Sequence, residues 1–191
     1  MTPQTQTVSR RAVLHRTVVL VGMMGSGKTA IGKSLADALQ MPFLDSDQEI
    51  ETAANATIAE IFARDGEAFF RRRESEVIDR LLASGPCILS TGGGAFMQRR
   101  NRKAIKRAGV AVWLDADLAL LWDRVRHKET RPLLRTPDPY GTLAALFESR
   151  RPLYAKAGLR LAVAPHASIE ETTRAVIDLL LTRPDILEVA P

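Results

Sequence analysis

The chain has 191 residues, of which 46% are apolar and 26% are charged, and its formal net charge is +5. This composition is that of one globular domain and excludes disordered and collagen-like classes. The sequence lacks the run of about 18 apolar residues that a transmembrane helix needs. Its single cysteine, Cys87, excludes an intramolecular disulfide framework and a multi-cysteine zinc site, and fits a reducing cytosol.

The two ends of the chain are predicted to be peripheral and frayed. Residues 1–16 form a flexible extension, residues 17–183 a single domain and residues 184–191 a tail. Ser9-Arg10-Arg11 resembles a twin-arginine export signal, and the acid-free stretch before Asp37 leaves a transit peptide as a further alternative. The apolar run that follows ends in a glycine-rich loop, which favours a core strand over a cleavable segment and a cytoplasmic location over export.

Strand-like and helix-like segments alternate between these ends. Continuous apolar runs predict strands at 17–21, 43–44, 87–90, 110–114 and 159–163. Helical periodicity and capping residues predict helices at 28–39, 57–66, 67–83, 117–125, 142–149 and 169–181, with a loop at 127–139. Strands that alternate with helices build a parallel sheet, and such sheets bind ligands at the carboxyl ends of their strands.

The first of these strand ends carries a phosphate-binding motif. Gly22-Met23-Met24-Gly25-Ser26-Gly27-Lys28-Thr29 matches G-x-x-x-x-G-K-[ST] between an apolar strand and an amphipathic helix. Backbone N–H groups and the helix N-terminus would cradle phosphates, Lys28 would reach the β- and γ-phosphates, and Thr29 would ligate Mg²⁺. The candidate ATP-binding residues of this segment are Gly25, Ser26, Gly27, Lys28, Thr29 and Ala30.

The second strand end carries two carboxylates, Asp45 and Asp47. One can approach Mg²⁺ while the other approaches an acceptor hydroxyl, and phosphoryl transfer needs both roles. The alternative is that Asp47 is only a helix N-cap. The third strand ends in Thr91 and the triplet Gly92-Gly93-Gly94, which either brings backbone N–H groups to a ligand or forms a flexible turn. This strand has no acidic residue at its end, so Asp45 is the candidate Mg²⁺ carboxylate.

Taken together, the motifs resemble the shikimate kinase family over residues 18–181. Beyond those above, the resemblance includes Phe70-Arg71, Arg131-Pro132-Leu133-Leu134 and Arg150-Arg151-Pro152-Leu153-Tyr154. It implies a three-layer α/β fold of the nucleoside-monophosphate-kinase-like P-loop type, with a five-stranded parallel sheet between helices. It also implies a helical substrate-binding region near 46–80, a mobile lid near 126–139, and ATP-dependent phosphorylation of the 3-hydroxyl of shikimate on the route to chorismate and the aromatic amino acids.

The resemblance also implies roles for individual residues. Asp47, Lys28 and Arg131 would be catalytic, Thr29 and Asp45 would hold Mg²⁺, and Arg124 and Arg131 would complete the ATP site. Arg71 and Arg150 would grip the shikimate carboxylate as planar two-donor forks, and Glu74 would orient the arginines. The residues implied for shikimate binding are Asp47, Arg71, Gly92, Gly93, Gly94 and Arg150. Arg72, Arg73 and Arg151 stay open as alternatives because each adjoins a candidate arginine.

Two other functions remain as alternatives. Another small-molecule P-loop kinase, such as a gluconate kinase, would share the loop but not the glycine triplet with two arginines. A nucleic-acid-associated P-loop NTPase would explain the basic charge, but the sequence lacks a recognition motif. We therefore expect ATP and shikimate as partners, no nucleic acid or membrane, and a monomer. The functional positive charge is expected to converge on one cleft at the strand ends.

Overall fold

A computed structural model describes residues 12–127 and 134–189 and has a parallel five-stranded sheet at its centre. Its order is β3-β4-β2-β5-β6, so the first of these strands in the chain is the central one, and the connections from β2 to β3 and from β4 to β5 each pass over one strand. The five predicted strands are confirmed, with bounds β2 (Thr17–Val21), β3 (Phe43–Asp45), β4 (Ile88–Ser90), β5 (Gly109–Asp115) and β6 (Leu159–Ala162). All pairings within the sheet are parallel, which brings the carboxyl ends of the strands to one edge.

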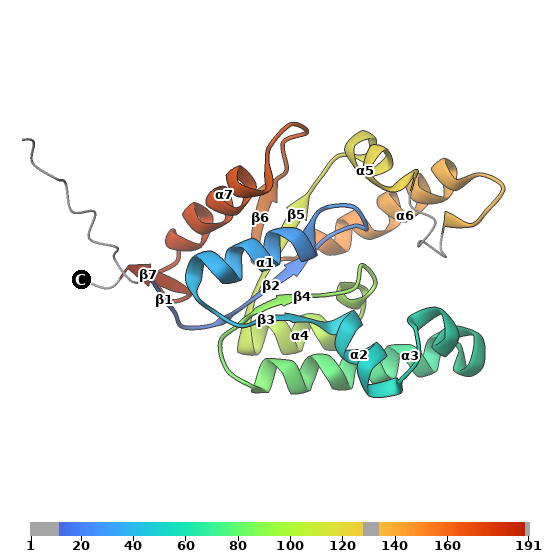
Figure 1. Cartoon of the computed structure of the whole chain (residues 1–191), viewed down its shortest axis with the longest axis horizontal. Helices are drawn as coiled ribbons and strands as arrows, with labels where there is room; N and C mark the ends of the chain where they lie inside the picture. Colours follow the sequence, from blue (N-terminus) through green and yellow to red (C-terminus); the bar gives the residue numbers. More distant parts are fainter. Residues whose placement is uncertain (1–11, 128–133, 190–191) are drawn as a thin grey trace, which may run out of the picture.

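Helices cover both faces of the sheet (Figure 1). On one face α1 (Lys28–Leu39) lies beside α7 (Ile169–Leu181), and on the other α3 (Ile58–Ala83) lies beside α4 (Arg99–Ala108). The remaining helical elements surround the carboxyl edge: α2 (Ser46–Ala54), the 3-10 turn η1 (Ala95–Met97), α5 (Leu118–Val125) and α6 (Pro139–Tyr154). This is the expected three-layer α/β fold.

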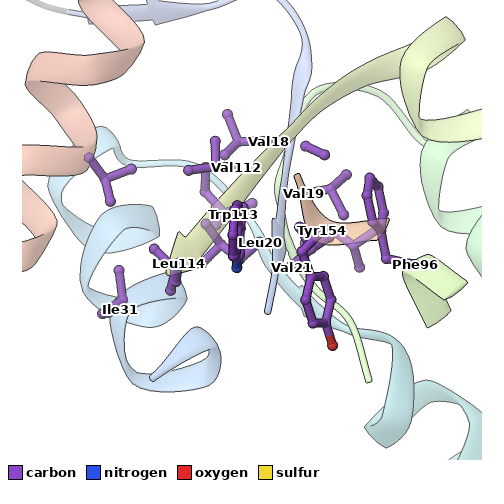
Figure 2. Packing of buried hydrophobic residues seen from close by; sticks show 14 of the residues in the cluster. Val18, Val19, Leu20, Val21, Ile31, Phe96, Val112, Trp113, Leu114 and Tyr154 are labelled. Carbon is purple, nitrogen blue, oxygen red and sulfur yellow. The ribbon is translucent and has the colours of Figure 1, made fainter. Parts of the chain in front are cut away.

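The central strand β2 is the most deeply buried part of the core. Val18, Val19 and Leu20 are 0% exposed because the strand is paired on both edges and covered on both faces. Figure 2 shows these side chains packed with those of β5, including Val112 and Leu114. A strand with no polar alternation is typical of a sheet buried on both sides. The core therefore fixes the position of β2, the strand that leads into the phosphate loop.

Helix α3 joins two helices that the sequence predicted separately. Its N-cap Thr57 and Glu60 form the predicted capping box, with Thr57 N donating to Glu60 Oε2 at 2.7 Å and Glu60 N donating to Thr57 Oγ1 at 3.2 Å. Gly66 interrupts the helix with φ 80° and ψ 168°, at the predicted boundary. Because this conformation suits glycine, the chain bends there and continues as a helix to Ala83.

Other helices depart from the prediction. Helix α6 is longer than the predicted 142–149, because Pro139 stands in the first turn, where no N–H is needed, and Asp138 caps it by accepting a 2.9 Å hydrogen bond from Gly141 N.

Helix α4 was not predicted, since only Ala104 and Ile105 supply a buried apolar face. Its outer side carries a cationic stripe of Arg99, Arg100, Lys103, Lys106 and Arg107.

The prediction that the chain ends are frayed is wrong for residues 12–16 and 182–189. Strand β1 (Ala12–Leu14) pairs antiparallel with β7 (Leu187–Val189), at the end of the molecule opposite to α5 and α6 (Figure 1). Leu14 and Leu187 are buried against the main core. Each strand has only three residues, and the two strands lie at opposite ends of the sequence. A local sequence pattern therefore could not predict that they pair.

Within the described residues, no helix combines the length and the apolar character needed to cross a bilayer.

Candidate active site

A cleft of about 590 Å³ opens at the carboxyl edge of the sheet, where the sequence places the chemistry. It runs between the phosphate loop, the start of α2, the glycine triplet and the start of α7. The lining residues are Met24, Gly25, Gly27, Lys28, Thr29, Ala30, Ile31, Asp45, Asp47, Ser90, Thr91, Gly92, Gly93, Arg124, Ala167, Ser168, Ile169 and Thr172. The contribution of the last four was not predicted, because the start of α7 carries a helix-capping pattern but no ligand-binding motif.

The phosphate loop wraps around the Lys28 side chain. Lys28 Nζ donates to the carbonyls of Gly22 and Met23, both at 2.9 Å, and the residue is 9% exposed. Gly27 adopts φ 97° as the N-cap of α1, and no acidic residue lies in the first turn of this helix. The helix N-terminus and the ammonium group therefore converge on one place, which suits a polyanion.

Arg124 of α5 closes the side of this loop, where its Nη1 donates to Gly25 O at 3.2 Å. The remaining predicted phosphate-binding cation, Arg131, lies outside the described residues.

The two carboxylate oxygens of Asp45 make different contacts. Oδ1 accepts from the backbone N–H of Asp47 at 3.0 Å and caps helix α2, whereas Oδ2 accepts from Thr29 Oγ1 at 3.2 Å. The cap of α2 is thus Asp45, and the alternative that Asp47 is only a helix cap is wrong. Thr29 and Asp45 place two hard oxygen atoms side by side at the mouth of the phosphate loop.

Asp47 is the second acidic group that lines the cleft. Burial raises its pKa to about 6, with a further increase from Asp45, while Lys28 opposes the shift. The side chain lies against Gly92: a Cβ on this glycine would stand 2.6 Å from Asp47 Oδ1. This carboxylate is therefore both close to the glycine triplet and able to take up a proton near neutral pH.

The other two glycines of the triplet face the two candidate arginines. A Cβ on Gly93 would stand 3.4 Å from Arg150 Nη1, and a Cβ on Gly94 would collide with the Arg71 guanidinium. The triplet is consequently a surface without side chains on which one carboxylate and two guanidinium groups rest. At Gly92 and Gly94 these contacts leave no room for a Cβ, whereas at Gly93 the contact with Arg150 is an ordinary one.

Arg71 is held in this position by Glu74. Arg71 Nη1 donates to both oxygens of Glu74 at 2.9 and 3.2 Å, and its Nη2 reaches Glu67 Oε1 at 3.3 Å. The Glu74 side chain is 1% exposed, and its burial raises its pKa, although the nearby Arg71 acts in the other direction. A buried carboxylate that pairs with one Nη of a guanidinium fixes the direction of the remaining donors.

The neighbouring arginines point elsewhere. Arg73 pairs with Glu76 at 2.7 Å. The guanidinium groups of Arg72 and Arg73 both lie over the Phe69 ring. Arg151 turns toward Asp115, with Nη2 at 3.6 Å from Oδ2. Arg71 and Arg150 are thus the members of the two arginine runs that reach the glycine triplet.

A glycine-rich loop at a helix N-terminus, beside a Thr–Asp oxygen pair and across from a carboxylate flanked by arginines, defines a P-loop phosphotransferase acting on a small acceptor. The shikimate kinase family model matches residues 24–181, and the chain belongs to this family.

Individual relatives agree with this membership. The chain is 62% identical to a shikimate kinase of Ruegeria pomeroyi over 94% of its own length and 92% of that protein. It is 61% identical to one of Cereibacter sphaeroides, covering 93% and 88% of the two chains. The solved structure of the Acinetobacter baumannii shikimate kinase in complex with shikimate superposes with a TM-score of 0.83 at 37% identity, covering 87% of this chain and 93% of that one.

Proposed function

We propose that the chain transfers the γ-phosphoryl group of ATP to the 3-hydroxyl of shikimate and releases ADP and shikimate 3-phosphate. The observation that carries the proposal is the glycine triplet, since each glycine lies against one of three groups suited to a hydroxylated carboxylic acid: Asp47, Arg150 and Arg71. Family membership supports the same acceptor. The product would enter the route to chorismate and the aromatic amino acids.

The nucleotide side of the cleft would use the phosphate loop and the cations around it. Lys28 would leave its two loop carbonyls, or share its three donors with them, to contact the β- and γ-phosphates. Arg124, which already lies on the loop at Gly25, would border the nucleotide. Gly25, Ser26, Gly27, Thr29 and Ala30 would supply backbone or hydroxyl donors around the phosphates.

Thr29 Oγ1 and Asp45 Oδ2 fit a Mg²⁺ ion that accompanies ATP. They are hard oxygen donors 3.2 Å apart, and Mg²⁺ is typically bound by one or two protein oxygens together with water and substrate phosphates. Among the described residues no cluster of three or more His, Cys, Asp or Glu side chains could hold a metal alone, which agrees with such a shared site. When bound, the ion would neutralise charge on the phosphate oxygens.

Arg71 and Arg150 would bind the acceptor carboxylate, and Asp47 would orient the attacking hydroxyl. Because Glu74 fixes Arg71, the acceptor would meet a guanidinium that is already in place. The pKa of Asp47, about 6, leaves it mostly ionised at neutral pH and therefore able to accept a hydrogen bond from the hydroxyl. Since the transition state of phosphoryl transfer is loose, Asp47 would receive the proton late.

A coupled ADP-release assay with shikimate and with gluconate, side by side, tests the proposal. We expect turnover with shikimate and none above the ATPase background with gluconate. Lys28→Met should lower kcat by at least about 1000-fold, because it removes the cation that meets the phosphoryl group. Turnover of gluconate at a similar rate, or near-normal turnover of Lys28→Met, would contradict the assignment.

We also propose that the enzyme acts as a monomer in the cytoplasm, without nucleic-acid or membrane partners. The single buried Cys87 is compatible with a reducing compartment. Sedimentation of the purified chain tests the oligomeric state, and a salt titration of its retention on an RNA column tests the nucleic-acid alternative.

A further inference from the structure

The turn that carries the glycine triplet has a hydrogen bond on every backbone carbonyl from residue 92 to residue 97. Two of these bonds are internal to the turn: Ala95 N donates to Gly92 O at 3.0 Å and Met97 N donates to Gly94 O at 3.1 Å. The other four carbonyls accept from side chains of α4 and α6. A segment with three consecutive glycines has much conformational freedom in isolation, so these outside bonds decide its shape.

Tyr154, in the last turn of α6, holds the middle glycine. Its hydroxyl donates to Gly93 O at 2.5 Å, and the Arg150 guanidinium lies near its oxygen. The residue is 1% exposed, so water cannot readily replace the bond to Gly93. Burial raises the pKa of Tyr154 to about 12, which keeps the phenol protonated and donating at any working pH.

The aromatic ring of Tyr154 is fixed by packing that does not involve the hydroxyl. Its centroid lies 6.2 Å from that of Trp113 and 6.4 Å from that of Phe96, both in stacked orientation. Figure 2 shows the three rings within the buried core. Removal of the hydroxyl would therefore leave the position of α6 unchanged and release only the glycine carbonyl.

Two side chains of α4 hold the far end of the same turn. Asn101, which is 0% exposed, donates from Nδ2 to Ala95 O at 2.9 Å. Arg102 donates from Nη1 to Phe96 O and to Met97 O, both at 2.7 Å. The contacts of both residues with the turn are to backbone carbonyls, so they act on the acceptor site through the backbone.

We propose that Tyr154, Asn101 and Arg102 are positioning residues for the acceptor: they hold the turn 92–97 so that its glycines receive Asp47, Arg150 and Arg71 in the geometry that binds the substrate. The inference rests on the proposed function, because the acceptor is the one assigned there. It predicts that loss of these bonds weakens acceptor binding and spares the nucleotide, since the phosphate loop is held by contacts of its own.

Tyr154→Phe is the sharpest test, because it deletes one oxygen atom and keeps the ring packing. We expect the KM for shikimate, and the dissociation constant from calorimetric titration, to rise by about tenfold, which corresponds to one buried carbonyl left without its partner. The KM for ATP should stay within about twofold. Loss of general stability would not separate the two substrates in this way.

Arg102→Met with Arg100→Met as its matched control provides an independent test. Both changes remove a cation from α4 and keep an unbranched stem, but Arg100 has a side chain that is 62% exposed and pairs with Asp79 instead of the turn. Arg102→Met should raise the KM for shikimate by about fivefold or more, Arg102→Lys should recover part of the loss, and Arg100→Met should change nothing measurable. If Tyr154→Phe does not fold, this pair decides the question.

The wild-type chain is assayed first, so that the two proposals fail separately. If it does not phosphorylate shikimate, the proposed function is wrong, and the positioning inference falls with it. If it does, the inference alone is overturned by either of two results: a shikimate KM unchanged in Tyr154→Phe and Arg102→Met, or a rise of equal size for shikimate and ATP.

Discussion

The Asp47 carboxylate lies so close to Gly92 that a Cβ on this glycine would stand 2.6 Å from Oδ1. The contact is with the free end of a side chain rather than with backbone. A methyl group at this position would therefore displace the carboxylate without disturbing the sheet.

This relationship predicts a graded series of glycine-to-alanine changes. Gly92→Ala would displace Asp47, and Gly94→Ala would displace the Arg71 guanidinium, whereas Gly93→Ala would meet Arg150 at an ordinary 3.4 Å contact. We expect kcat/KM for shikimate to fall at least about 100-fold in the first two variants and less than tenfold in the third. Thermal melting should show that all three remain folded. A Gly93→Ala variant as damaged as the others would show that the backbone, not the facing groups, requires glycine.

Glu74→Gln should weaken acceptor binding because Arg71 would lose its buried carboxylate partner. The expected result is a rise of about tenfold in the KM for shikimate and a loss of about 1–3 kcal/mol in the free energy of unfolding. Steady-state kinetics and urea unfolding measure the two effects.

Glu67→Gln is the matched control, since Glu67 contacts the same guanidinium at 3.3 Å but its side chain is 66% exposed. An exposed pair contributes little, so its KM should change less than about twofold. Equal effects of the two substitutions would show that burial of Glu74 is not what orients Arg71.

Asp47→Asn should stabilise the metal-free protein at pH 7.5 while it abolishes most activity. Burial raises the pKa of Asp47 from 3.8 to about 6, so the folded state holds its proton more tightly than the unfolded state. Between these two values the stability of the wild type falls as pH rises, and above pH 6 the buried charge costs up to about 1–3 kcal/mol. Asparagine removes this cost.

Urea unfolding in the presence of a chelator measures this effect at pH 7.5 and at pH 4. The stability gained from Asp47→Asn should be largest at pH 7.5 and nearly absent at pH 4, where the wild-type carboxyl is mostly protonated in the folded state. A gain of the same size at both pH values would rule out the buried charge as its cause.

The phosphate loop and the five strands were predictable because their signals are local. A continuous apolar run such as residues 17–21 is visible without knowledge of its partners, and parallel topology then places the strand ends together. The choice of Arg71 over Arg72 and Arg73 came from the resemblance. Its physical cause lies in tertiary packing, because Glu74, three residues further along the same helix, is buried and pairs with Arg71.

The distribution of positive charge could not be predicted in the same way. The sequence predicted that the functional positive charge converges on one cleft, but it did not predict that α4 places Arg99, Arg100, Lys103, Lys106 and Arg107 on an exposed face away from that cleft. Arg102 belongs to the same basic run and yet folds inward onto the carbonyls of η1. Composition cannot distinguish an exposed arginine of α4 from one that bonds to the protein, because the difference depends on which side of the helix faces the protein.

The pairing of the chain ends leads to a last prediction, on stability. Leu187 in β7 is 0% exposed and packs into the main core, whereas Val189, two residues further along the same strand, is 40% exposed. Leu187→Ala should therefore lower the free energy of unfolding by about 2–5 kcal/mol, and Val189→Ala by less than about 0.5 kcal/mol. Urea unfolding monitored by tryptophan fluorescence measures both. Similar small losses in the two variants would mean that the C-terminal strand is not part of the cooperative core and that the domain is complete without the β1–β7 pair.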